Sequence, residues 1–388
     1  MEHAPLKDVY VLDCSMLLPG PYCTMLLAEM GAKVVKVERA GTGDTIREVI
    51  PGCFDYLNGN KKFVTVNLKH KKGLDIFLKM AEKADVIVES FRPGIAKRLG
   101  IDFDTVKKIN PSIIYCAISG YGQTGPYSVV PGHDINYQGL SGLLSLSGDP
   151  DKVPGFPDGF QVADLSGSMF ALISILGALY GRKNSSDPVY LDISISESLA
   201  MWMMPRYFEY LGLSRPSKSK FMGRGPYGIF ETKDNRYITI GVVEDHFWMN
   251  LCMVLGLDDL ASDPSLKGWH TRNHERKRIV SRLKAAIKEN DAEYWLRTLT
   301  DADVPVAPVC DFENWMDNPQ FEYRGFFPSG EGKIQSNKKF RRFPVNELID
   351  SKIREAEKSI SGMDNFEILT ELGLSENEID QLKNDGVV

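Results

Sequence analysis

The sequence predicts an α/β protein whose first part is built on a mainly parallel β-sheet. Over the first hundred residues, short runs rich in Val and Ile alternate with segments in which apolar residues recur at helical spacing. Strands separated by helices of this length form βαβ units, and the strands of such units are parallel. Ligands of these sheets bind beyond the carboxyl ends of the strands, so functional residues are expected in the segments that follow each strand.

The expected elements of the first part follow one another along the chain. Residues 63–68 alternate apolar and polar side chains, as a half-buried strand does. Residues 71–83 form a predicted helix, because Leu74, Phe77 and Met80 are spaced to lie on one face. Further strands are expected at residues 8–13, 33–38, 85–89, 113–118 and 189–194, and further helices at residues 22–30, 165–179 and 197–211.

A change of composition at residues 214–225 predicts a domain boundary. Ser, Lys, Arg, Pro and Gly cluster there, as they do in linkers. The stripe of Met and aromatic residues just before it, in 197–211, is interpreted as core packing and not as a cofactor site. In the second part we expect a β-hairpin over 227–231 and 236–242, helices at 245–255 and 274–299, a strand at 304–309 and two short helices within 359–388.

The bulk composition excludes several classes of protein. The chain has 388 residues, enough for two domains, with 43% hydrophobic and 25% charged residues. Its net charge of -6 provides no basic surface for nucleic acid. No uncharged apolar stretch reaches about 18 residues, so no membrane span is expected. The six cysteines form no C-x-x-C pair and no Cys/His spacing that suits zinc, so we expect reduced thiols, a cytoplasmic location and no metal.

His133 and Asp134 form the first candidate site. They follow the glycine-rich turn Gly120–Pro126 and precede a predicted helix. A histidine beside an aspartate at a helix start can act as a general base near neutral pH. The same pair can instead be a hydrogen-bonded histidine and a helix cap, and the sequence leaves both interpretations open.

Asp164 and Glu244 are two further carboxylates at the starts of predicted helices. Asp164 precedes a run of small residues that opens a helix, and Glu244 follows the predicted strand at 236–242. Either side chain can be an N-cap, and either can stand where a ligand approaches. The two roles are compatible, because the start of a helix is an accessible end of the element.

Basic residues after strand or turn signals suggest a site for the phosphates of a nucleotide-like ligand. They are Arg39, Lys61, Lys62 and Arg92, and ordinary surface charge is the alternative. A nicotinamide-binding fingerprint is excluded, because Ile46 stands where G-x-G-x-x-G needs its third glycine. The chain also lacks a P-loop motif and a G-x-S-x-G motif.

Several segments of the sequence form a recognisable set. They are Leu18–Tyr22, Gly31–Arg39, Glu89–Gly94, Gly120–Pro126, the pair Ala163–Asp164 and the tail segment Glu371–Glu378. Together, and over nearly the whole chain, they resemble the class III CoA-transferase superfamily. This superfamily, also called the CaiB/BaiF family, includes the α-methylacyl-CoA racemases.

The resemblance implies a large Rossmann-like domain formed by residues 1–215 and 325–388, and a smaller α/β domain formed by residues 225–324. It also implies an interlocked homodimer, with each active site between the large domain of one subunit and the small domain of the other. Coenzyme A, as the substrate thioester, would lie along the large domain. The residues expected to bind it are Arg39, Lys61, Lys62 and Arg92 at its phosphates, together with Pro19, Tyr121 and Gly122.

The resemblance also implies catalytic roles. Asp164 matches the family's catalytic aspartate, which attacks the donor thioester in transferases and acts as a base in racemases. His133 matches the second base of racemases, at a position where transferases commonly carry tyrosine. Glu244 matches a racemase glutamate, and backbone N–H groups near Asp134 are expected to hold the enolate oxygen.

The preferred hypothesis is epimerisation of a 2-methylacyl-CoA, without a metal. The alternative is CoA transfer between carboxylic acids through a covalent intermediate at Asp164, and a catalytically silent CoA-binding protein is a third hypothesis. The coexistence of His133, Asp164 and Glu244 argues against the silent protein. The chain departs from the racemase pattern at residues 223–228, where Gly–Arg–Gly–Pro–Tyr–Gly replaces Gly–Gly–Ala–Pro–(Phe/Tyr)–Tyr. The expected partners are an acyl-CoA and a second copy of the chain, and neither nucleic acid nor membrane.

Overall fold

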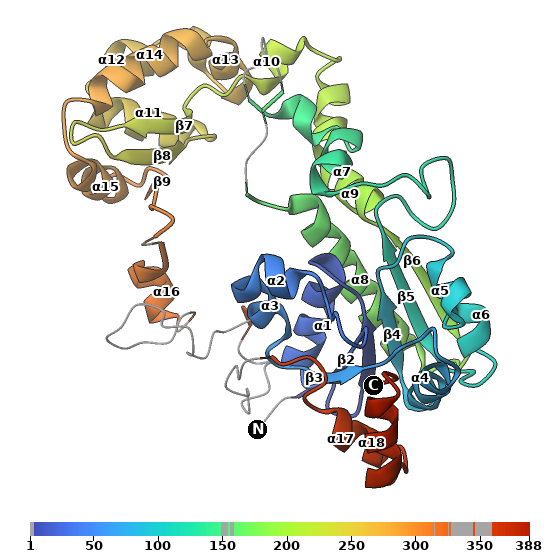
Figure 1. The fold of residues 1–388 in the computed structure, drawn as a ribbon. Helices are drawn as coiled ribbons and strands as arrows, with labels where there is room; N and C mark the ends of the chain where they lie inside the picture. Colours follow the sequence, from blue (N-terminus) through green and yellow to red (C-terminus); the bar gives the residue numbers. More distant parts are fainter. Residues whose placement is uncertain are drawn as a thin grey trace. The chain divides into compact units, whose positions relative to one another are not determined.

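The computed structural model describes residues 4–148, 154–155, 159–313, 315–324, 326, 344–345 and 359–388. The chain divides into two compact units (Figure 1). The first unit comprises Met1–Ser145, Phe156–Pro205 and Glu322–Val388, and the second comprises Leu146–Gly155 and Arg206–Phe321. The long segment of the second unit therefore begins at Arg206, before the change of composition at residues 214–225 that predicted the domain boundary. Arg206 lies inside a helix, Ile195–Gly212, that runs through the junction.

A six-stranded parallel sheet forms the centre of the first unit. Its order is β3-β2-β1-β4-β5-β6, and each neighbouring pair is parallel. The order reverses between β1 and β4, and open α/β sheets bind ligands at such a switch point. The α/β class and the parallel sheet predicted from the sequence are confirmed. The strands are β1 (Tyr10–Cys14), β2 (Lys33–Glu38), β3 (Lys62–Thr65), β4 (Val86–Glu89), β5 (Ile114–Ser119) and β6 (Val189–Ser194).

Helices cover both faces of this sheet. Successive residues of β1 point to opposite faces, so that Val11 is buried with Leu27 of α1 while Leu12 is buried with Phe77 of α4. Each face is thereby closed by its own apolar layer. The helices of the unit that precede the C-terminal segment are α1 (Pro19–Glu29), α2 (Ile46–Val49), α3 (Pro51–Asn58), α4 (Lys71–Lys83), α5 (Ile95–Leu99), α6 (Phe103–Val106), α7 (Asp134–Leu140), α8 (Val162–Gly181) and the first part of α9 (Ile195–Gly212).

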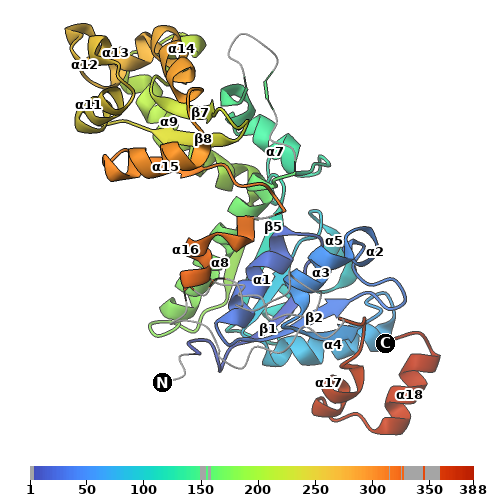
Figure 2. The same ribbon diagram turned by 90° about the vertical axis from the view of Figure 1, so that its left-hand side faces the viewer.

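The C-terminal segment returns to the edge of this sheet. Its helices α17 (Asn365–Glu371) and α18 (Glu376–Asn384) lie on the same side as α4 (Figure 2). Asp364 accepts a hydrogen bond from the N–H of Phe63 at 2.7 Å, and Asn365 accepts one from the N–H of Thr65 at 2.9 Å. These side chains satisfy N–H groups of the edge strand β3, so both ends of the chain build one unit.

The second unit contains a three-stranded antiparallel sheet of order β7-β8-β9. The predicted hairpin is present, and Asn235 has the positive φ of 58° that its turn needs. The helix predicted over 274–299 is divided into two, because Asp291 begins a new helix. The elements are α10 (Lys218–Met222), β7 (Tyr227–Glu231), β8 (Tyr237–Gly241), α11 (Asp245–Val254), α12 (Asp258–Ala261), α13 (Trp269–His274), α14 (Arg276–Ile287), α15 (Ala292–Asp301), β9 (Val306–Pro308) and α16 (Pro319–Tyr323).

Two helices of the first unit carry more exposed apolar surface than core helices do. Within the described residues, α8 is long and apolar enough to cross a membrane by length and composition alone, with a mean hydropathy of 1.8. Its Ala171 and Ile175 are nevertheless buried against the sheet, and core helices pass the same test. In α9, Met201 is 59% exposed and Trp202 is 46% exposed. The interpretation of this stripe as core packing is therefore wrong for these residues in the single chain.

Candidate active site

Asp164 lies in the first turn of α8, but it does not cap the helix. The N-cap position belongs to Gln161. Within the described part of the chain, the Asp164 carboxylate makes no hydrogen bond and no ion pair. Of the two roles left open by the sequence, the cap is thus excluded, and the carboxylate is free to meet a ligand.

Asp134 performs the capping instead. Its carboxylate accepts hydrogen bonds from the N–H of Ala163 at 2.8 Å and from the N–H of Asp164 at 3.0 Å. The amide of Gln138 donates to its other oxygen. Asp134 is buried and does not line the neighbouring cavity. Its predicted catalytic role therefore gives way to that of a residue that positions Asp164.

His133 and Asp164 line one cavity of about 340 Å³. His133 immediately precedes α7, and its N–H donates to Asn136 Oδ1 at 3.0 Å, so that N–H is not available to an enolate oxygen. The cavity lies beyond the carboxyl ends of β4 and β5, as expected for this sheet. Among the residues predicted to bind the coenzyme, Pro19, Arg92 and Tyr121 line the same cavity.

Burial controls the acidity of this cavity. Burial, and then the negative charge of Asp134, raises the pKa of Asp164 to about 7. Burial, and then the charge of Asp164, raises the pKa of Tyr137 to about 12, so this phenol keeps its proton at neutral pH. A carboxyl group that is close to half-protonated at neutral pH can either take or give a proton.

The two aromatic rings in the wall of the cavity depend on a glycine. Tyr121 and Tyr137 meet edge to face, with ring centroids 5.1 Å apart. A Cβ atom on Gly120 would lie 2.4 Å from the Tyr137 ring, so only glycine fits there. Gly122, which was predicted to bind the coenzyme, does not line the cavity. It has a φ of +85° in a turn whose next N–H, that of Gln123, donates to Asp192 at 3.1 Å.

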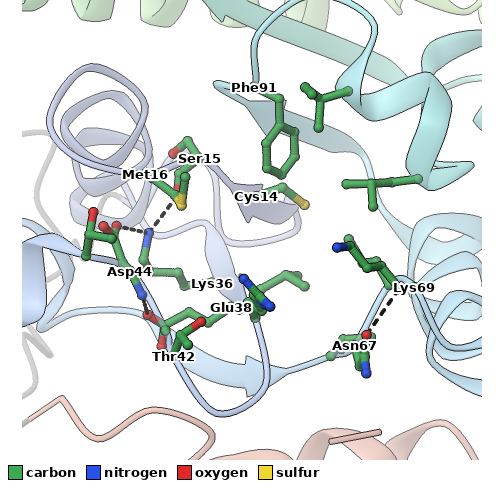
Figure 3. A pocket seen from close by; sticks show the side chains of 18 of the residues that line it. Cys14, Ser15, Met16, Lys36, Glu38, Thr42, Asp44, Asn67, Lys69 and Phe91 are labelled. Carbon is green, nitrogen blue, oxygen red and sulfur yellow. Dashed lines mark hydrogen bonds and ion pairs between the residues drawn. The ribbon is translucent and has the colours of Figure 1, made fainter.

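A second and larger cavity, of about 630 Å³, lies at the carboxyl ends of β1, β2 and β3. Arg39 lines it, as does the loop that follows β2, and Lys69 and Arg98 add two cations that the sequence analysis missed. None of these three cations is in an ion pair within the described residues. Figure 3 shows Lys69 and Asn67 on one side of the cavity, opposite Lys36 and Asp44.

The two cavities share part of their walls. Met16 and Phe91 line both of them. The N–H of Met16 donates to Ser90 Oγ at 2.9 Å, and the next residue, Leu17, has a positive φ of 63° that side chains rarely adopt. The segment between the cavities is thus held in a fixed conformation, and a long ligand could pass from one cavity to the other across it.

Lys61 is not available to a ligand, which corrects its predicted role. Its ammonium group is fully buried and donates to Asp13 at 2.9 Å, to the carbonyl of Pro21 at 3.0 Å and to Thr24 and Asn58 at 2.8 Å. Lys62 also lines neither cavity and pairs with Glu367. These lysines belong to the packing of the first unit.

Glu244 belongs to the second unit, where it follows β8. It occupies the N-cap position of α11 without making a side-chain cap bond. Its side chain is exposed and forms no ion pair within the described residues. The next carboxylate, Asp245, is engaged by the buried Arg272. Across the described ranges, no three His, Cys, Asp or Glu side chains are grouped as metal ligands would be.

Comparisons with known proteins agree with this fold. The family described as CoA-transferase family III matches residues 6–346. The chain is 31% identical to acetyl-CoA:oxalate CoA-transferase of Acetobacter aceti, over 84% of this chain and 86% of that protein. It is 30% identical to α-methylacyl-CoA racemase of Mus musculus, over 99% of this chain and 97% of that protein. A crystal structure of a CAIB/BAIF family protein from Brucella suis matches with a TM-score of 0.78 and 26% identity, over 95% of this chain and 99% of that one.

The chain therefore belongs to the class III CoA-transferase family, whose enzymes act on CoA thioesters. This confirms the resemblance that its motifs indicated. Both transferases and racemases occur among its relatives.

Proposed function

We propose that the chain epimerises 2-methylacyl-CoA thioesters by moving a proton at the carbon next to the thioester carbonyl. The observation that carries this proposal is the presence of His133 and Asp164 in one cavity. One group takes the proton and leaves an enolate, and the other gives a proton to the opposite face. No net proton is consumed, and the configuration at the carbon is reversed.

The acidity of Asp164 supports this role. With a pKa of about 7, its carboxyl group is present in both forms at neutral pH. It can therefore take the proton from one enantiomer and, when the reaction runs in reverse, give a proton to the enolate on that same face, as a reversible epimerase requires. Glu244 is proposed to assist the proton transfer from the second unit.

The larger cavity is the proposed seat of the nucleotide part of coenzyme A. Its cations Arg39, Lys69 and Arg98 would meet the phosphates, since charge-assisted hydrogen bonds to phosphate are strong. The pantetheine arm would then cross Met16 and Phe91 into the smaller cavity, where the thioester would lie. Arg92 and Tyr121 remain proposed contacts at that end.

CoA transfer between carboxylic acids is the second candidate function. The similarity to acetyl-CoA:oxalate CoA-transferase favours it, as does the unpaired Asp164 carboxylate. In this reaction the carboxylate attacks the thioester carbonyl and CoA thiolate leaves, which gives a mixed anhydride. The thiolate then attacks the aspartyl carbonyl, which releases the first acid and leaves an aspartyl-CoA thioester for the acceptor acid.

One experiment separates the two functions. The enzyme is incubated with a 2-methylacyl-CoA in deuterated water, with and without a second carboxylic acid. Deuterium gained at C2 without the second acid supports the epimerase. Transfer of CoA to the added acid without exchange refutes it, and trapping of Asp164 by hydroxylamine would point to the transferase.

We also propose that the chain functions as an interlocked homodimer in the cytoplasm. The exposed apolar side chains of α8 and α9 support a second copy as the partner, because such patches are rare on monomers. In the first unit they include Ile173 at 58% exposure, Tyr180 at 70% and Met201 at 59%. Light scattering coupled to size-exclusion chromatography would detect a dimer, and a monomer at micromolar concentration would contradict the proposal.

A further inference from the structure

One buried arginine holds the backbone on both sides of Glu244. Arg272 of α13 is fully buried. It donates from Nη1 to Asp245 Oδ1 at 2.5 Å and from Nη2 to the carbonyl of Val243 at 2.6 Å. Nη1 also donates to the carbonyl of Leu266 at 3.2 Å. The residue before Glu244 and the residue after it are therefore fixed by a single rigid guanidinium group.

The carboxylate of Glu244 is left out of this arrangement. Glu244 occupies the N-cap position of α11, and its side chain makes no hydrogen bond to the first turn of that helix. The two adjacent carboxylates are therefore in different environments. Asp245 pairs with Arg272, whereas Glu244 is presented to solvent on a backbone that the same arginine restrains.

Stability alone does not account for the buried arginine. Its Nε is buried and has no hydrogen-bond partner within the described residues. The guanidinium group is buried while its partner Asp245 is half exposed, so the cost of desolvating the cation offsets much of its attraction to the carboxylate. The arrangement instead fixes the backbone on both sides of Glu244. The planar guanidinium donates at fixed angles to three acceptors, which lie on two segments of the chain.

The helix that carries Arg272 also fixes a second loop, at the same end of the strands β7 and β8. The next residue, Asn273, accepts a hydrogen bond from the N–H of Gly225 at 2.8 Å. A Cβ atom on Gly225 would lie 2.7 Å from the carbonyl oxygen of Arg272, so the turn packs directly on α13. The N–H of Val242 donates to the carbonyl of Pro226 at 3.0 Å and joins the two loops. Residues 223–226 and 242–245 are therefore held as one piece.

We propose that Arg272 is a positioning residue for Glu244, which it orients by holding Val243 and Asp245 without contacting substrate. This inference rests on the proposed function, in which Glu244 assists the reaction. Active-site groups need to be held close to their productive geometry, and a displacement of about 1 Å can cost about a hundredfold in rate.

A double-mutant cycle on the full-length enzyme tests this proposal. Its variants are Glu244→Gln, Asp245→Asn, Arg272→Lys and the doubles that combine Glu244→Gln with each of the other two. The cycle measures kcat and KM for whichever reaction the unmodified chain catalyses, deuterium exchange into 2-methylacyl-CoA or CoA transfer. Asp245→Asn and Arg272→Lys are expected to lower kcat by about ten- to a hundredfold and to leave KM unchanged. Neither should lower kcat further when Glu244→Gln is already present.

The outcomes separate failure of the positioning role of Arg272 from failure of the proposed function. Losses that multiply in the double variants, or a raised KM with unchanged kcat, overturn the positioning role. An unaffected Glu244→Gln variant overturns it by removing the role of Glu244 itself. If the unmodified chain only transfers CoA, the epimerase proposal is wrong. The cycle, measured on CoA transfer, still tests whether Arg272 positions Glu244. If Arg272→Lys does not fold, the half-exposed Asp245 carries the cycle. Asp259→Asn is then the control, because Asp259 is similarly exposed and pairs with an arginine of the same unit, Arg282.

Discussion

The carboxylate of Asp134 accepts a hydrogen bond from the backbone N–H of Asp164 at 3.0 Å. A second bond, from the N–H of Ala163, completes a cap on α8. The charge on Asp134 is also, after burial, a cause of the raised pKa of Asp164. One residue thus fixes the position of the proposed catalytic carboxylate and disfavours its ionised form.

Replacement of Asp134 by asparagine should separate these two effects. The side-chain amide oxygen of the variant can still accept from the two N–H groups, but the negative charge is gone, so the pKa of Asp164 should fall from about 7. The limb of the pH profile of kcat/KM that reports Asp164 should then move to lower pH. A profile that does not move, with activity retained, would show that Asp134 does not influence the acidity of Asp164. Asp263→Asn, at a cap in the second unit, is the matched control and should leave the profile in place.

Asp164→Asn should stabilise the fold in a pH-dependent way while it abolishes activity. Because the folded-state pKa of Asp164 is raised above the ordinary value of 3.8 to about 7, the folded chain holds this proton more tightly than the unfolded chain. The carboxyl group therefore contributes a loss of stability that grows as pH rises from about 4 to about 7 and then levels off. Removing it should raise Tm more at about pH 8 than at about pH 5. Thermal unfolding at the two pH values measures this difference, and an equal or smaller gain at the higher pH would contradict the raised pKa.

Local sequence patterns were sufficient for most of the first unit. The strands β2 and β6 occupy the predicted residues, 33–38 and 189–194, because short segments that contain β-branched and aromatic residues favour strands. Local patterns were less informative about burial, because the burial of a side chain depends on what packs beside its helix or strand. Nothing local distinguishes a core stripe in α9 from a surface stripe, and Met201 proves exposed in the single chain.

The candidate site shows the same contrast. The family motifs pointed to His133 and Asp164, and the fold brings both to one cavity. Lys61 was misjudged because its partner, Asp13, lies on another strand and is not apparent from neighbouring residues. Lys69 and Arg98 were missed because each has other basic residues beside it in the sequence, Lys71 and Lys97 among them, and only the fold shows which of these residues reach the cavity that Arg39 lines. The one signal for Lys69 was its place shortly after a predicted strand.

Removal of the exposed cations of the larger cavity should weaken coenzyme binding but not the chemistry. Lys69→Ala and Arg98→Ala each remove a proposed contact to phosphate, and a hydrogen bond to a charged group contributes roughly 1.5–3 kcal/mol. KM for acyl-CoA should therefore rise by about tenfold or more in each variant, with kcat little changed. An acyl-pantetheine substrate, which lacks the nucleotide, should not distinguish the variants from the unmodified enzyme. Lys107→Ala, at an exposed pair with Asp104, is the control. Equal losses with both substrates would place the nucleotide elsewhere.

Lys61→Met should damage folding and spare coenzyme binding. The buried ammonium group of Lys61 is the partner of the buried Asp13, so the variant leaves a carboxylate without its counter-charge. Loss of one partner of a buried ion pair typically costs about 3–5 kcal/mol, and Tm should fall by several degrees. The fraction that remains folded should bind acyl-CoA with an unchanged KM, because Lys61 lines neither cavity. The double variant Asp13→Leu, Lys61→Met, which removes both charges, should recover part of the lost Tm. A stable Lys61→Met variant with a raised KM would instead return Lys61 to the coenzyme site.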